Sequence, residues 1–133
     1  MRVGDELETA EHLIDGSVVQ LYGEVALDFN PIHFDDVAAA RLGFPARIAH
    51  GMISGGVLNR MLTHNLGQDW LRSGRLDIKF VRPVLVGDTI LAGGTVTGAT
   101  PLSADVWVRD SEGRDVIIGT ATLPPANADS ARP

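Results

Sequence analysis

Residues 51–65 read GMISGGVLNRMLTHN, and this segment determines how the rest of the chain can be arranged. It is predicted to form a helix that begins at Gly51 and is ended by Gly67. The apolar side chains that repeat along it are Ile53, Val57, Leu58, Met61 and Leu62. Two glycines inside it, Gly55 and Gly56, each cost about 1 kcal/mol relative to alanine. We therefore expect another backbone to approach closely, as in a curved sheet that wraps this helix.

The chain after Gly74 changes to a hydrophobic period of two, which is typical of strands. The predicted strands span residues 76–80, 90–97, 104–109 and 116–123. The turns at 86–88 and 111–113 are short, which favours antiparallel connections.

Three elements are predicted before the central helix: a strand or extended arm at 7–14, a helix at 16–26 capped by Asp15 or Ser17, and a helix at 31–42 ended by Gly43. Helices followed by a meander of strands predict an α+β domain, with the apolar helix packed on one face of an antiparallel sheet. The domain is expected to span residues 1–123. The polar, proline-bearing segment 124–133 is predicted to be a disordered tail.

The composition is that of an ordinary globular protein, with 133 residues, 44% hydrophobic and 21% charged. The chain contains no cysteine, which excludes disulfides, thiol catalysis and cysteine-ligated zinc. The N-terminus lacks the apolar run of a signal peptide, and no apolar stretch is long enough to span a bilayer. We expect a cytoplasmic protein without a membrane partner.

The charge is unevenly distributed along the chain. The net charge is −6, which argues against nucleic-acid binding because phosphate neutralisation requires clustered Lys and Arg. Residues 1–40 carry a net charge of −8, whereas residues 41–82 carry +5. The basic middle could attract a phosphate-bearing ligand, and an unevenly charged, solvated surface is the alternative.

Residues 28–33 read DFNPIH and place a carboxylate and an imidazole on either side of a turn. On a single α-helix, Asp28 and His33 would point about 140° apart. Pro31 prevents this, because it lacks an N–H, disfavours helical geometry at Asn30 and suits the first position of a new helix. Asn30 is then the natural N-cap. We expect the turn to bring Asp28 beside His33.

An Asp and a His that share one water molecule can take its proton and return a proton elsewhere, which is general acid/base catalysis. The alternative is that Asp28 is a surface acid and His33 a turn histidine, and the spacing leaves both open. Gly51 is the third candidate, because an unobstructed N–H at a helix start stabilises an oxygen that gains negative charge. Without an accompanying acid/base pair, a tight turn into the helix would be the better explanation of Gly51.

Other kinds of site have weaker support. The potential metal ligands are Asp28, His33, Asp35, Asp36, His50 and His64, and they show no H-E-x-x-H or comparable spacing. Neither a metal nor any other cofactor is therefore predicted. No serine lies in a nucleophile-elbow motif.

Three segments together resemble the MaoC-like dehydratases, a family that includes (R)-specific enoyl-CoA hydratases. They are residues 28–33, residues 47–52 (RIAHGM) and residues 80–89, in which FVRPV is followed by VGDT. The resemblance extends from about Gly16 to Leu123 in the same order and spacing. It implies a hotdog fold, in which an antiparallel sheet wraps the helix at 51–65.

The resemblance also implies a reaction, the reversible syn addition of water across a trans-2-enoyl thioester to give an (R)-3-hydroxyacyl thioester. Asp28 and His33 match the pair that holds and activates the water, and Gly51 matches the residue whose N–H binds the thioester oxygen. The implied substrate is an acyl-CoA or acyl-carrier-protein thioester. The implied assembly is a homodimer or a dimer of dimers, with the acyl chain along the subunit interface.

Four further residues are candidates for substrate contact: Asn30, Pro31, Ile53 and Asn59. Asn59 matches a position where relatives often carry a small polar residue near the acyl pocket, whereas Ile53 is expected mainly to pack in the core. The chain has Ala26-Leu27 where the family commonly has Ser-Gly, a departure that bears on pocket shape.

Two other function classes stay open. A hotdog thioesterase would use the same helix start and direct water at the carbonyl carbon. A non-catalytic hotdog subunit of a hetero-oligomer would need none of this chemistry.

Overall fold

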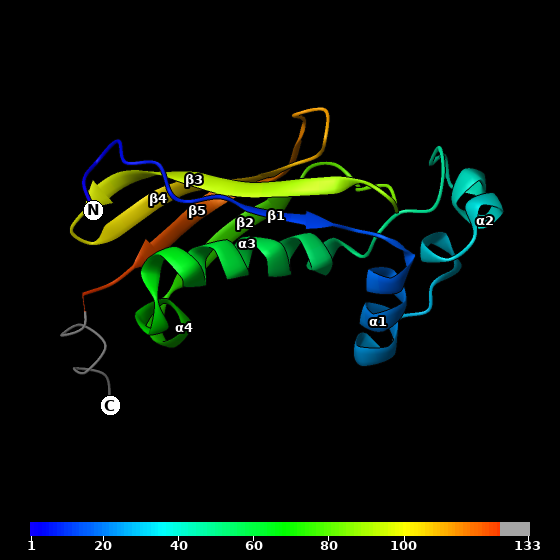
Figure 1. Cartoon of the computed structure of the whole chain (residues 1–133), viewed down its shortest axis with the longest axis horizontal. Coiled ribbons are helices and arrows are strands. Elements are labelled where there is room, and N and C mark those ends of the chain that lie inside the picture. The colour runs from blue at the N-terminus through cyan, green and yellow to red at the C-terminus, as the bar shows by residue number, and fades with distance from the viewer. Residues whose placement is uncertain (126–133) are drawn as a thin grey trace.

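The computed structural model describes residues 1–125, which form a five-stranded antiparallel sheet with strand order β1-β3-β4-β5-β2. The strands are β1 (Ala10–Leu13), β2 (Arg75–Phe80), β3 (Thr89–Ala99), β4 (Leu102–Arg109) and β5 (Asp115–Leu123). The helices are α1 (Gly16–Ala26), a 3-10 helix (Pro31–His33), α2 (Asp36–Arg41), α3 (Gly51–Leu66) and α4 (Gln68–Ser73). Figure 1 shows the sheet along α3, with α1 and α2 beyond the helix N-terminus.

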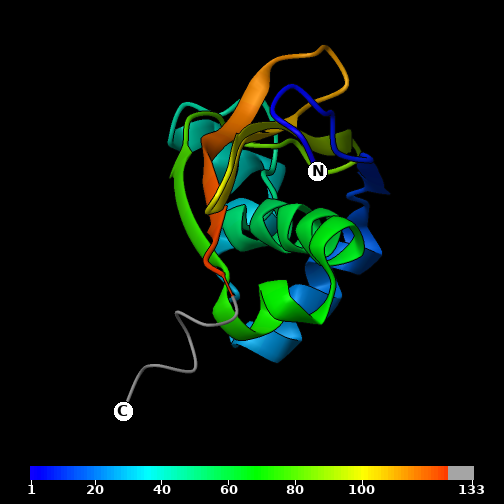
Figure 2. The same cartoon turned by 90° about the vertical axis from the view of Figure 1, so that its left-hand side faces the viewer.

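The core lies between α3 and the concave face of the sheet. Figure 2 looks along α3 and shows the strands curving around it. Leu58, Met61 and Leu62 have no exposed surface and share one hydrophobic cluster with side chains of the sheet. The predicted α+β class and the antiparallel sheet wrapped around this helix are confirmed. No helix within residues 1–125 is long and apolar enough to cross a membrane.

The expectation that a backbone packs closely on Gly55 and Gly56 is wrong for the described chain. A methyl group at Gly56 would meet no atom within 4 Å, and one at Gly55 would meet only the side chain of Met52, at 3.4 Å. Close approaches occur within the sheet instead, at Gly93 and Gly94 in β3 and at Gly119 in β5, where a Cβ would clash with the backbone of Asp77. A Cβ at Gly93 would lie 2.5 Å from the indole ring of Trp107, so the sheet itself requires glycine there.

The helix predicted at 31–42 is also wrong, because the structure has two helices there. The 3-10 helix ends at His33, and α2 begins at Asp36. Asp35 separates them, because its side chain accepts a hydrogen bond from the N–H of Val37 at 2.9 Å and so caps α2. The Asp35 cap therefore begins α2 as a separate helix.

Helix α4 has no counterpart among the predicted elements. Its six residues are too few to show a helical period, and it follows directly on the Gly67 that ends α3. Trp70 fixes the helix, since its side chain is buried and its indole N–H donates to Oδ1 of Asn59 at 2.8 Å. A tertiary contact between two helices therefore stabilises α4.

The predicted arm at 7–14 is a strand only at β1, which pairs with β3. Glu8 leaves the ladder because its backbone pairs with the side chain of Asn65 on α3. The Glu8 N–H donates to Oδ1 of Asn65, and Nδ2 of Asn65 donates to the Glu8 carbonyl, both at 2.9 Å. Of the tail predicted at 124–133, residues 126–133 lie outside the described residues.

Asp110 is a buried carboxylate in the turn between β4 and β5, with a side chain only 3% exposed. Its Oδ1 accepts from the backbone N–H groups of Glu112 and Arg114, and its Oδ2 accepts from Nε of Arg114, each at 3.0 Å. Burial alone would raise the pKa of this carboxyl. The hydrogen bonds and the Arg114 charge outweigh burial and hold the pKa below its ordinary value.

We expect Asp110→Asn to lower the free energy of unfolding at pH 7 by about 1–3 kcal/mol, through lost hydrogen bonds to a charged group. Because the pKa of Asp110 is lower in the folded than in the unfolded state, its stabilisation is present above about pH 4 and is lost as the pH falls through the folded-state value. Urea unfolding should therefore show the difference between wild type and D110N shrinking as the pH falls below about 4. Asp105→Asn, at an exposed position on β4, is the matched control; a D110N difference independent of pH would contradict the assignment.

Candidate active site

The turn at residues 28–33 is built by local hydrogen bonds after the end of α1. Leu27 has a positive φ of 55° and caps α1, and the Asp28 N–H donates to the Gly23 carbonyl at 3.0 Å. The side chain of Asn30 accepts from the N–H of Ile32 at 3.2 Å. The predicted N-cap at Asn30 and the new helix that starts at Pro31 are both confirmed.

His33 is held in one orientation by the segment that precedes α3. Its ring is buried, and Nδ1 lies 2.7 Å from the backbone oxygen of Ile48. A carbonyl oxygen can only accept, so Nδ1 carries the hydrogen and donates it. In the neutral ring, Nε2 is then the nitrogen that can accept a proton.

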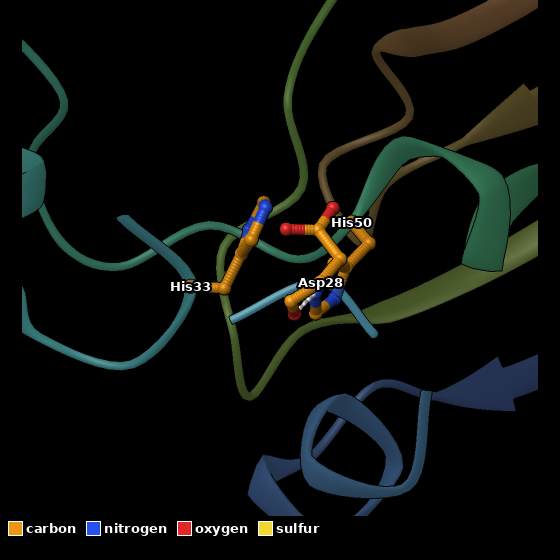
Figure 3. Close-up of side chains that lie close together, drawn as sticks. All are labelled: Asp28, His33 and His50. Carbon is orange, nitrogen blue, oxygen red and sulfur yellow. Dashed lines mark hydrogen bonds between the residues drawn. The ribbon is translucent and has the colours of Figure 1, made fainter. Parts of the chain in front are cut away.

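Asp28 and His33 lie together, as the turn predicts. Their side-chain ligand atoms, with one from His50, all lie within 4.8 Å of one another. Figure 3 shows the Asp28 carboxylate beside the His33 ring. Asp28 is exposed and His33 is buried, so solvent reaches the pair from the carboxylate side.

Gly51 is the first residue of α3, as predicted, and its N–H has no acceptor among residues 1–125. A surface pocket of about 380 Å³ includes both Gly51 and His33. Its other lining residues are Phe44, Ile48, Ala49, Phe80, Val81, Arg82 and Pro83. An imidazole and a free amide at a helix N-terminus therefore line one mainly apolar pocket.

The stretch of sequence that contains Asp28, His33 and Gly51 matches a known family. A family model described as MaoC like domain matches residues 2–113. The chain belongs to the MaoC-like family. Its sequence is 35% identical over 113 residues to an (R)-specific enoyl-CoA hydratase from Rhodospirillum rubrum, covering 83% of this chain and 78% of that protein.

Two further proteins are similar to this chain, one in sequence and one in structure. The chain is 33% identical over 92 residues to a mitochondrial 3-hydroxyacyl-[acyl-carrier-protein] dehydratase from Arabidopsis thaliana, covering 68% of this chain and 53% of the plant protein. The structure superposes on the unliganded R-hydratase PhaJ1 from Pseudomonas aeruginosa with a TM-score of 0.78 and 25% identity. That match covers 94% of this chain and 83% of the other.

His50 is the residue of this MaoC-like site that the sequence did not single out beyond its metal-ligating potential. It is buried, and its ring stacks on that of His33 with a centroid distance of 3.8 Å. Its Nε2 donates to the backbone oxygen of Asp28 at 2.9 Å. The sequence signal that could have identified His50 as a site residue was its position directly before Gly51, on the same segment as Ile48.

The proximity of Asp28, His33 and His50 does not by itself make a metal site. An ion binds imidazole in the plane of the ring, along the lone pair of the nitrogen. The two histidine rings are stacked face to face, with centroids 3.8 Å apart and an interplanar angle of only 27°. The arrangement is poorly suited to two imidazole ligands on one ion.

The remaining predicted contacts lie in different places. Asn30 and Pro31 are exposed in the turn beside Asp28, and Ile53 is buried in the core cluster. Asn59 lies two turns along α3 from Gly51, where its side chain accepts from Trp70. Substrate contact by these four residues stays a prediction.

The basic segment is not gathered at the pocket. Arg82 lines the pocket, and its Nη1 donates to the carbonyl of Asp115 at 2.9 Å. Arg47 lies near Asp36, with 4.0 Å between Nε and Oδ1, and Arg60 donates to the backbone of Glu11 farther along α3. Arg82 is thus the basic side chain placed to meet a ligand in this pocket.

Proposed function

We propose that this MaoC-like domain is a hydro-lyase that reversibly adds water to a trans-2-enoyl thioester, giving an (R)-3-hydroxyacyl thioester. The observation that carries the proposal is the position of His33, which lies beside the Asp28 carboxylate and lines one pocket with Gly51, whose N–H is free within residues 1–125. The similarity to the R. rubrum hydratase supports the same chemistry.

The chemistry follows from what each group can do. The oxygen of a water molecule held between Asp28 and His33 forms a bond to C3, and the electron pair of the double bond moves toward the thioester oxygen. The Gly51 N–H and the N-terminal end of α3 stabilise the negative charge that develops on that oxygen. The pair accepts one proton from water and returns one to C2, so the enzyme regains its starting state.

The tautomer of His33 fits this sequence of steps. Because Nδ1 donates to the Ile48 carbonyl, the neutral ring presents Nε2 as its proton acceptor. The same hydrogen bond holds the ring when it becomes charged, since Nδ1 donates in both states. The imidazole can therefore gain and lose a proton without rotating.

The proposed substrate is an acyl-CoA or acyl-carrier-protein thioester, and the proposed assembly is a homodimer or a dimer of dimers. Strand β2 supports self-association, because it lies at an edge of the sheet. Phe80 and Val81, at its end, are 46% and 42% exposed and line the pocket. A second copy along this edge would cover apolar side chains beside the site. Light scattering coupled to gel filtration measures the assembly directly.

One assay separates the proposed reaction from its alternatives. The purified chain is incubated with trans-2-butenoyl-CoA, and loss of the conjugated enoyl thioester is followed by ultraviolet absorbance while free thiol is titrated. Hydration removes the enoyl absorbance and releases no thiol. Thiol release would identify a thioesterase, and an inactive chain of defined oligomeric mass would support a non-catalytic subunit.

A further inference from the structure

His50 is placed so that one residue contacts all three parts of the proposed site. Its ring touches the backbone of Asp28 through a hydrogen bond and the ring of His33 through stacking. Its peptide bond to the next residue supplies the N–H of Gly51. Figure 3 shows the three side chains grouped together.

The hydrogen bond of His50 determines its tautomer. Nε2 faces the carbonyl oxygen of Asp28, which can only accept, so Nε2 must carry the hydrogen. The other nitrogen, Nδ1, is buried and has no hydrogen-bond partner among residues 1–125. A buried polar atom without a partner is costly and needs a physical explanation. Within residues 1–125, the His50 ring therefore makes its hydrogen bond to Asp28 alone.

Asp28 needs such a restraint, because its turn is otherwise open to solvent. Asp28, Phe29 and Asn30 are all exposed, and the Asp28 backbone has one other anchor, its N–H on the Gly23 carbonyl. The bond from His50 joins residues 22 positions apart in sequence. It ties the exposed turn to the buried segment that leads into α3.

Stacking on His50 restrains the rotation of the His33 ring that its own hydrogen bond does not prevent. The bond from Nδ1 to the Ile48 carbonyl fixes where the ring edge points, whereas rotation about that bond would tilt the ring. His50 covers one face at 3.8 Å and opposes that tilt. Tyr22 supports the ring of His50 in turn, with centroids 4.7 Å apart.

We propose that His50 is a positioning residue, which holds the Asp28 carboxylate and the His33 imidazole in register with each other and with the Gly51 N–H. The inference rests on the proposed hydration reaction. His50 acts through the side chains it contacts and takes no proton from the substrate. The hydrogen bond to Asp28 contributes more to this positioning than the stacking on His33 does, because it orders Asp28, the exposed residue of the catalytic pair.

Two substitutions separate the contributions of the ring and its N–H. His50→Phe keeps an aromatic face for stacking and removes the donor, whereas His50→Gln places an amide N–H where Nε2 lies and removes the ring. Misplacing a reacting group by about 1 Å can cost about 10²-fold in rate. We expect H50F to lower kcat by about 10- to 100-fold with KM changed less than about threefold, and H50Q to recover most of the loss. His64→Phe, at an exposed histidine of α3, is the matched control.

A second readout does not depend on activity. Amide hydrogen exchange should accelerate at residues 28–30 in H50F, remain close to wild type there in H50Q, and stay unchanged in the strands of both variants. If H50F does not fold, His50→Asn replaces it, because the shorter asparagine cannot reach the Asp28 carbonyl.

The outcomes distinguish this inference from the proposed function. Wild-type kcat together with unchanged exchange in H50F would overturn the positioning role and leave the reaction standing. A wild-type chain that hydrates no enoyl thioester, while H50F still loosens residues 28–30, would overturn the reaction and keep the structural restraint.

Discussion

Asp28→Asn is expected to lower kcat for the hydration of trans-2-butenoyl-CoA by about 10²–10⁴-fold. The amide cannot take or give the proton that the carboxylate handles. It should preserve the turn, because its oxygen can still accept from the N–H of Asn30, now 3.3 Å from Oδ1. Glu24→Gln, at an exposed position on α1, controls for the loss of one negative charge.

His33→Asn tests the other residue of the pair. The asparagine side chain can place an N–H near the position of Nδ1, so the bond to the Ile48 carbonyl can persist while the group at Nε2 is removed. We expect a loss of similar size, again mainly in kcat. Turnover by either variant within a few-fold of wild type, with unchanged thermal unfolding, would contradict the assigned pair.

Gly51→Pro is expected to lower kcat by about 10²–10³-fold, because it removes the N–H proposed to stabilise the thioester oxygen. The fold should tolerate the change. Gly51 is the first residue of α3, where proline is favoured, and its own N–H has no protein acceptor within residues 1–125. His50 already has a ψ of 133°, which suits a residue before proline.

Gly51→Ala separates the loss of the N–H from the addition of a side chain. Its methyl group would meet Phe80 at 3.5 Å, an ordinary contact, and its N–H remains. Steady-state kinetics should therefore show G51A much closer to wild type than G51P. Equal losses in both variants would show that bulk at this position, and not the amide, explains the effect.

The parts of the fold that local signals determine could be predicted from the sequence. Helix α1 runs from Gly16 to Ala26 as expected, with Asp15 accepting from the N–H of Val18 at 3.0 Å. The break at Pro31 depends on proline and on the cap at Asn30, both of which act within a few residues. Caps and proline geometry therefore located the turn that brings Asp28 to His33.

The features that were missed depend on tertiary contacts. Helix α4 is stabilised by the bond between Trp70 and Asn59, which are 11 positions apart. The glycines that a close approach requires lie in the sheet, because Trp107 on the neighbouring strand covers Gly93 and the backbone of Asp77 covers Gly119. The contacts of His50 could not be read from spacing either, since they need residues 28 and 50 to be brought together by the fold.

The most direct measurement of the central claim is the stereochemistry of water addition. The chain is incubated with trans-2-butenoyl-CoA in D₂O, and the product is examined by NMR and chiral chromatography. A site in which Asp28 and His33 handle water and proton on one side of the substrate predicts that one deuterium is added at C2 syn to the hydroxyl, and the similarity to the R. rubrum hydratase predicts the (R)-3-hydroxybutyryl-CoA product. Anti addition, an (S) product, or release of free CoA without hydration would contradict it.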